Sequence, residues 1–97
     1  MPKKGLKVLE QMRRSQANWT RRDLDNLYEH FGFEIRHGSS HDIVRHSQFP
    51  LLRDTLPRHK EIGKAYIKNA IELIDQLIAI RGADALEMEE NDEPKSP

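Results

Sequence analysis

Three stretches of the 97-residue chain carry apolar residues at helical spacing. The first covers residues 4–14, the second runs from Thr20 to Phe31, and the third begins at residue 64 or 65 and ends at Gly82. In the third stretch the apolar residues lie three, four and seven positions apart, which predicts an amphipathic helix with one buried face. These apolar residues are Ile67, Ala70, Ile71, Ile74, Leu77 and Ile78.

The second helical stretch has clear start and end signals. Thr20 is placed to cap it, and Asp23 lies three residues later, as in a capping box. Trp19 and Leu24 occupy the two positions of a hydrophobic staple, and Gly32 suits a left-handed C-cap. The expected apolar face consists of Leu24, Leu27, Tyr28 and Phe31, and the residues expected to face water are Arg21, Arg22, Asp25 and Glu29.

Between the second and third helices the pattern is that of strands. Apolar and polar residues alternate over 33–36, residues 38–40 (Gly-Ser-Ser) form a turn signal, and a second strand is expected over 41–45. A short third strand over 51–56 ends before Pro57. The order α, α, β, β, β, α favours an α+β fold, with the helices on one face of a small three-stranded antiparallel sheet. The other face of the sheet is then free for a ligand.

One hydrophobic core is expected between the sheet and the helices. The length suits a single domain, and the absence of cysteine excludes disulfides and cysteine-based zinc sites. The most apolar segment, residues 66–80, contains Lys68, Glu72 and Asp75, so we expect no membrane span and a soluble, cytoplasmic protein. The expected core residues are Leu24, Leu27, Phe31, Phe33, Ile35, Val44, Ile67, Ile71 and Ile74.

The formal net charge of zero hides an asymmetry. Residues 1–82 contain 15 Lys and Arg against 10 Asp and Glu, whereas residues 83–97 contain six acidic residues and one lysine. We therefore expect a basic domain over 1–82 and an acidic, disordered tail over 83–97. A basic domain favours a polyanionic partner.

Two of the five histidines have cationic neighbours that suit RNA cleavage. Attack of a 2′-hydroxyl on the adjacent phosphate needs a proton acceptor, a proton donor and cations around the phosphate. His41 and His59 are the candidate imidazoles, although many basic domains carry histidines without this role. The candidate cations are Arg36, Arg45, Arg58 and Lys60. We expect no metal site from the histidine spacing, and we expect His37 and His46 to lie in turns or at strand edges.

Two motifs in this region resemble those of the HicA family of toxin ribonucleases. The family carries Gly-Ser-His at the start of its second strand, then a hydrophobic residue and often Arg-His, and later Val-Pro-x-His. The matching residues here are Ser40-His41, Val44, Arg45-His46, Leu56-Pro57 and His59. The resemblance covers roughly residues 20–77. Ser39 stands at the position of the family glycine, and Asp42 adds a negative charge beside the expected phosphate site.

The resemblance implies a fold similar to a double-stranded-RNA-binding domain (dsRBD), with residues 1–18 as an N-terminal helical extension. It implies a metal-independent endoribonuclease that cleaves mRNA, needs no cofactor and is neutralised by a HicB-like antitoxin. Neither a membrane nor DNA alone is an expected partner. His41 corresponds to the catalytic histidine of the family, and the RNA or phosphate contacts are assigned to Arg36, Ser40, Arg45, Arg58, His59 and Lys60. The alternatives are an RNA-binding module without activity and a protein-interaction domain.

Overall fold

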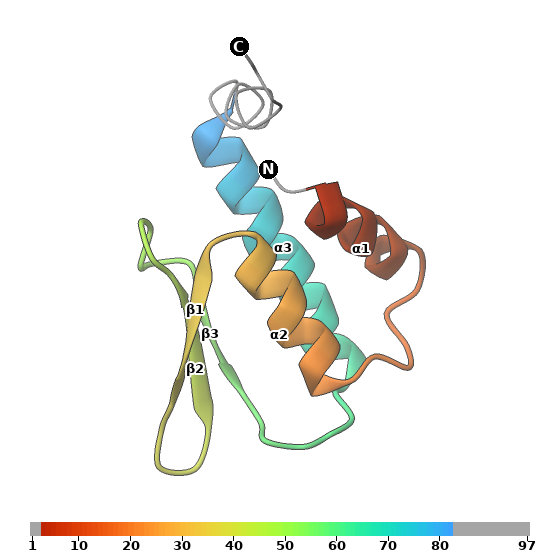
Figure 1. The fold of residues 1–97 in the computed structure, drawn as a ribbon, viewed down its shortest axis with the longest axis vertical. Helices are drawn as coiled ribbons and strands as arrows, with labels where there is room; N and C mark the ends of the chain where they lie inside the picture. The colour runs from red at the N-terminus through yellow and green to blue at the C-terminus, as the bar shows by residue number, and fades with distance from the viewer. Residues whose placement is uncertain (1–2, 83–97) are drawn as a thin grey trace.

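A computed structural model describes residues 3–82 of the chain, and these residues form three helices and a three-stranded sheet (Figure 1). The expected acidic tail, residues 83–97, lies outside the described residues. Along the chain the elements are α1 (Lys3–Arg14), α2 (Arg21–His30), β1 (Phe33–His37), β2 (Asp42–His46), β3 (Arg53–Leu56) and α3 (Lys64–Arg81).

The sheet has the strand order β1-β2-β3, with both pairs antiparallel. The helices lie on one side of it, and the N-terminal helix α1 packs against α2 and α3 (Figure 1). This confirms the α+β fold, and the arrangement is consistent with a dsRBD-like fold carrying an extra N-terminal helix. β1 and β3 form the two edges of the sheet, and no helix or strand of the described residues covers the face opposite the helices.

The hydrophobic core lies between the sheet and the helices, as expected from periodicity. Two of the expected core residues, Ile35 and Ile71, are only half-buried and pack against its margin. α1 adds Leu9 and Met12, so the N-terminal helix is part of the domain's core. The remaining buried apolar residues are Leu24, Leu27, Tyr28, Phe31, Phe33, Val44, Leu52, Leu56, Ile62, Ile67, Ala70, Ile74 and Leu77.

The capping box of α2 is formed as the sequence predicts. The Thr20 hydroxyl accepts a hydrogen bond from the Asp23 backbone N–H at 3.1 Å, and the Asp23 carboxylate accepts one from the Thr20 N–H at 3.0 Å. Gly32 follows the helix with φ of +87°, and a Cβ there would lie 3.0 Å from Nε2 of His46. Both observations explain why the chain has glycine at this turn.

Two strands begin later than the sequence suggested. β2 begins at Asp42 rather than His41, and β3 begins at Arg53 rather than Leu51. A turn closes before β3, because the Leu52 N–H donates to the Phe49 carbonyl at 2.9 Å. Leu52 is buried by this turn and Leu51 is left 92% exposed.

Candidate functional site

The β1–β2 hairpin turns very tightly at the Gly-Ser-Ser segment. The Gly38 N–H donates to the His41 carbonyl at 2.9 Å. A Cβ at position 38 would lie 2.5 Å from that carbonyl oxygen, closer than real Cβ contacts allow. Gly38 is therefore required by the close approach of the two backbones at the hairpin tip.

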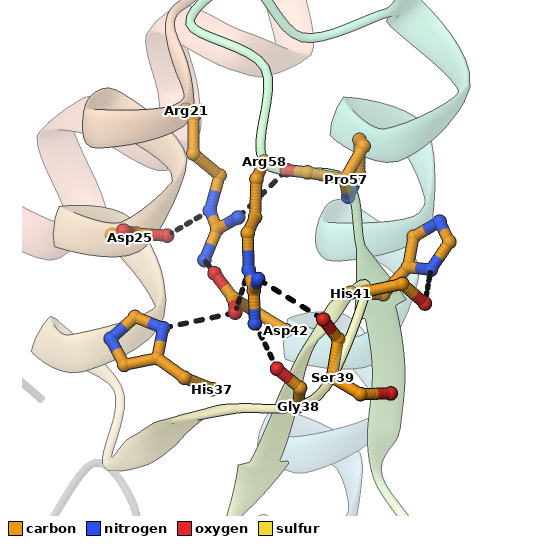
Figure 2. A network of polar contacts seen from close by, with 10 residues as sticks. Arg21, Asp25, His37, Gly38, Ser39, His41, Asp42, Pro57 and Arg58 are labelled. Carbon is orange, nitrogen blue, oxygen red and sulfur yellow. Dashed lines mark hydrogen bonds and ion pairs between the residues drawn. The ribbon is translucent and has the colours of Figure 1, made fainter.

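Strand alternation divides the polar residues of β2 between two faces. Ile43 and Arg45 are exposed on the open face, whereas Asp42 and His46 are buried on the helix side. His41, just before β2, is exposed, and its Nδ1 lies 3.2 Å from the Ser40 hydroxyl oxygen. Figure 2 shows the His41 ring pointing away from Asp42 and its partners.

The open face of the sheet, called here the outer sheet face, is rich in arginine. Arg36 of β1 is opposite Ile43, and Arg45 of β2 is opposite Arg53 of β3. Within residues 3–82 none of the three arginines forms an ion pair. Ile43 is 37% exposed on the same face, between Arg36 of β1 and Thr55 of β3. The structure places Arg36 and Arg45 on one face, and the exposed His41 directly precedes β2.

Asp42 is the centre of an ion-pair network on the opposite, helix-facing side (Figure 2). Its side chain is only 4% exposed. Oδ2 accepts a hydrogen bond from Arg21 Nη2 at 2.8 Å, and Oδ1 accepts one from Arg58 Nε at 2.9 Å. His37 Nδ1 lies 2.9 Å from the same Oδ1. Asp42 carries a negative charge, as expected, but strand alternation turns it inward onto these partners and away from the face of Arg36 and Arg45.

The pKa of Asp42 reflects two opposing effects. Burial alone raises the pKa of the carboxyl group, but the hydrogen bonds from His37, Arg58 and Arg21 outweigh it and hold the pKa well below its ordinary value. Asp42 is therefore ionised at neutral pH and can only accept hydrogen bonds.

Arg58 and Arg21 of this network also connect different parts of the fold. Arg58 donates to Asp42, to the Gly38 carbonyl and, at 3.5 Å, to the Ser39 carbonyl, so it fastens the hairpin tip to the β3–α3 loop. Arg21 was expected to face water, but its side chain is only 11% exposed. Besides Asp42, it donates to Asp25 at 2.6 Å and to the Pro57 carbonyl at 2.7 Å.

A pocket of about 680 Å³ lies over this network, between the start of α2, the hairpin and the β3–α3 loop. We call it the hairpin pocket. It gathers Arg58, His59 and Lys60 from the sequence prediction, but it includes neither His41 nor the arginines of the outer sheet face. Its lining residues are Thr20, Arg21, Arg22, Asp25, His37, Asp42, Arg58, His59 and Lys60.

His37 is a pocket residue that the sequence reasoning did not select. Because Asp42 is ionised and accepts only, the His37 nitrogen facing it, Nδ1, carries a proton. In the neutral ring Nε2 is then the acceptor. A carboxylate that fixes the tautomer in this way prepares an imidazole for proton transfer or for accepting a ligand hydrogen bond.

His46 lies in the core, not at a strand edge as expected. It is 1% exposed, and its ring packs edge-on against Phe33 at a centroid distance of 4.9 Å. Nε2–H donates to the Phe31 carbonyl at 3.1 Å, and Nδ1 accepts from the backbone N–H groups of Gln48 and Phe49 at 3.0 and 3.2 Å. Both nitrogens are thereby satisfied, which gives His46 a structural role.

The described part of the chain offers no cluster of three or more His, Cys, Asp or Glu residues arranged to hold a metal ion. None of the helices between residues 3 and 82 has the length and apolar character needed to cross a membrane.

The protein is therefore a small α+β protein with two candidate binding surfaces. One is the arginine-rich outer sheet face, and the other is the cationic hairpin pocket on the helix side of the sheet. Comparison with protein-family models, with curated proteins and with solved structures finds no match for this chain.

Proposed function

We propose that this chain is an RNA-binding endoribonuclease that cleaves mRNA in the cytoplasm and is held inactive by a HicB-like antitoxin. The observation that carries the proposal is the exposed imidazole of His41 beside the outer sheet face. Arg36 and Arg45 of that face have no ion-pair partners among residues 3–82, so their guanidinium groups are available to phosphate.

The chemistry is an internal transesterification. Neutral His41 accepts the proton of a ribose 2′-hydroxyl, the 2′-oxygen attacks the adjacent phosphorus, and the bond from phosphorus to the 5′-oxygen breaks. The departing 5′-oxygen takes a proton from water, and His41 returns its proton to the solvent. The products carry a 2′,3′-cyclic phosphate and a 5′-hydroxyl. Arginine donors stabilise the additional charge on the phosphate in the transition state.

The remaining site residues take more specific roles than the sequence suggested. Ser40 contacts Nδ1 of His41 and can orient the ring. Arg58 holds the hairpin tip in place, because it bonds to the Gly38 and Ser39 carbonyls. His59 and Lys60 lie in the hairpin pocket, and we assign to them contacts with RNA that extends past the tip.

The antitoxin is proposed to cover the outer sheet face. Ile43 is exposed there among three arginines, and an apolar residue in such a place is explained by a partner that buries it. The surrounding arginines favour an acidic partner surface. Binding of this kind would block His41 and the phosphate contacts together.

The test compares the wild type with His41→Ala on a single-stranded RNA. We expect the substitution to lower cleavage by about 10²–10⁴-fold, the contribution of one acid–base group. His30→Ala, at the far end of α2, is the matched control and should cleave normally. EDTA should not inhibit, and a substrate with deoxyribose at the cleaved position should resist. Full activity of His41→Ala, or cleavage of the deoxy substrate, would overturn the mechanism.

An RNA-binding module without activity is the second candidate. It is favoured by the surroundings of the His41 ring, whose only hydrogen-bond partner among the described residues is the Ser40 hydroxyl, so no charged group activates it. RNA affinity without cleavage by the wild type would establish this reading.

A further inference from the structure

The hairpin pocket carries positive charge that the proposed chemistry of His41 does not use. Four cations and two carboxylates line it, which leaves a net charge of +2 with both imidazoles neutral. Arg21 and Arg58 are bonded to Asp42. Arg22 and Lys60 are exposed and form no ion pair within residues 3–82, so the free positive charge of the pocket lies with them.

The pocket also presents two flat rings. His59, exposed on the β3–α3 loop, has no hydrogen-bond partner in the described part of the chain. His37 is held at Nδ1 by Asp42, and its side chain is 80% exposed. Its Nε2 is therefore a positioned acceptor on an accessible ring. Imidazole rings stack on unpaired bases and bond to their edges, as other aromatic side chains do in single-stranded RNA complexes.

The pocket walls are tied together, so the site exists before any ligand arrives. The backbone N–H of Arg21 donates to the backbone carbonyl of Lys60 at 2.8 Å, which joins the start of α2 to the β3–α3 loop. Arg58 joins that loop to the hairpin tip. A volume of about 680 Å³ lies within the range of small-molecule sites and accommodates one nucleotide.

We propose that the hairpin pocket binds one unstacked nucleotide of a single-stranded RNA. The phosphate meets Arg22 and Lys60, and the base lies against His37 and His59. This inference rests on the proposed function, because it assigns the pocket to the same RNA strand that reaches His41. Arg58 of the pocket bonds to the carbonyls of Gly38 and Ser39 in the hairpin tip that leads to His41, so we place the bound nucleotide next to the cleaved one.

The phosphate contact is tested by the salt dependence of binding. The probe is a fluorescent single-stranded RNA with 2′-O-methyl groups throughout, which removes the nucleophile and prevents cleavage. Lys60→Ala should weaken binding and lower the slope of log K against log salt concentration by about 0.7, the value for one phosphate contact on a single strand. Lys68→Ala removes the same charge from the exposed surface of α3, outside the pocket, and should leave the slope unchanged.

The base contact is tested with His37→Ala. Loss of a stacked base should weaken binding by at least ~5-fold, the lower end for aromatic stacking. His30→Ala is again the control. NMR of the wild type adds a readout independent of folding, because the ring signals of His37 and His59 should shift when the probe is added and that of buried His46 should not.

The outcomes separate the two proposals. If the wild type binds no RNA, the proposed function and the pocket assignment fail together. If the wild type binds the probe, but Lys60→Ala matches Lys68→Ala and the His37 signal does not move, the pocket assignment fails and the ribonuclease proposal stands. A lower slope for Lys60→Ala together with moving His37 and His59 signals supports the pocket.

Discussion

Removal of the Asp42 carboxylate should strongly destabilise the protein. In Asp42→Ala the guanidinium of Arg21, whose side chain is only 11% exposed, loses its buried partner. Leaving one member of a buried ion pair uncompensated costs about 3–5 kcal/mol. Arg21 keeps its bonds to Asp25 and the Pro57 carbonyl, so the loss should lie at the lower end of this range, about 3 kcal/mol. Arg58 and His37 also lose a hydrogen bond to Asp42, but their side chains are 42% and 80% exposed. Water can replace Asp42 as their partner, so they contribute little to the loss of unfolding free energy.

The loss is measured as the free energy of unfolding from urea titration at pH 7. For a domain of this size about 3 kcal/mol also corresponds to a fall in Tm of at least ~12 °C. Because this approaches the whole stability of a small domain, Asp42→Asn is the second variant. The asparagine amide keeps the shape of the side chain and one hydrogen-bond acceptor. The decrease in unfolding free energy for Asp42→Asn should therefore be smaller than for Asp42→Ala but still above about 1 kcal/mol.

The pH dependence gives an independent check on the same network. Since the pKa of Asp42 is lowered on folding, its stabilisation is complete above the unfolded value of about 3.9 and is lost as the pH falls below it. The difference between wild type and Asp42→Asn should therefore be constant from pH 7 to 5 and shrink below about pH 4.

Asp25→Ala is the matched control. Asp25 bonds to the same arginine, Arg21, but its side chain is 31% exposed and the pair spans one helical turn. Its loss should cost only about 0.3–0.5 kcal/mol. If Asp42→Ala costs no more than Asp25→Ala, the network does not stabilise the hairpin and the reasoning above is refuted.

Two further predictions concern glycine and histidine positions. Gly38→Ala should cost about 1–3 kcal/mol, because its Cβ would press on the His41 carbonyl at 2.5 Å. Gly63→Ala, whose Cβ would have no atom within 4 Å, is the control, and equal losses would contradict the close approach. For His46, burial and the positive charge of Arg81 lower the pKa, so its stabilisation is complete above pH ~6.5 and declines as the pH falls below that. The difference in unfolding free energy between wild type and His46→Asn should shrink from pH 7 to pH 5, and a constant difference would show that His46 is not held neutral.

Much of the fold follows from local patterns in the sequence. The capping box at Thr20, the glycine after α2 and the apolar face of α3 all depend on residues close together in the chain, and all three are confirmed. The predicted first residues of β2 and β3 were less accurate. For β3, the turn that buries Leu52 depends on a backbone hydrogen bond that no residue pattern predicts.

The candidate site could be predicted only in part. Strand alternation correctly predicted that Arg45 lies on the open face, and His41 is exposed just before the strand. The same alternation also predicts that Asp42 and His46, which lie two residues before and after the buried Val44, point inward. The partners of Asp42 could not be found in this way, because Arg21 and Arg58 are 21 and 16 residues distant and meet it only in the folded chain.

The edges of the sheet have a consequence for how the protein behaves at high concentration. Within residues 3–82, the outer sides of β1 and β3 have backbone groups with no neighbouring strand, and such edges invite pairing with another chain. Here both are short, with five and four residues, and each carries charge, at Glu34 and Arg36 in β1 and at Arg53 and Asp54 in β3. The few backbone bonds to be gained, and the charged side chains that pairing would remove from water, oppose growth of a continuous sheet between molecules. The hairpin can thus remain exposed for a ligand without becoming a seed for aggregation.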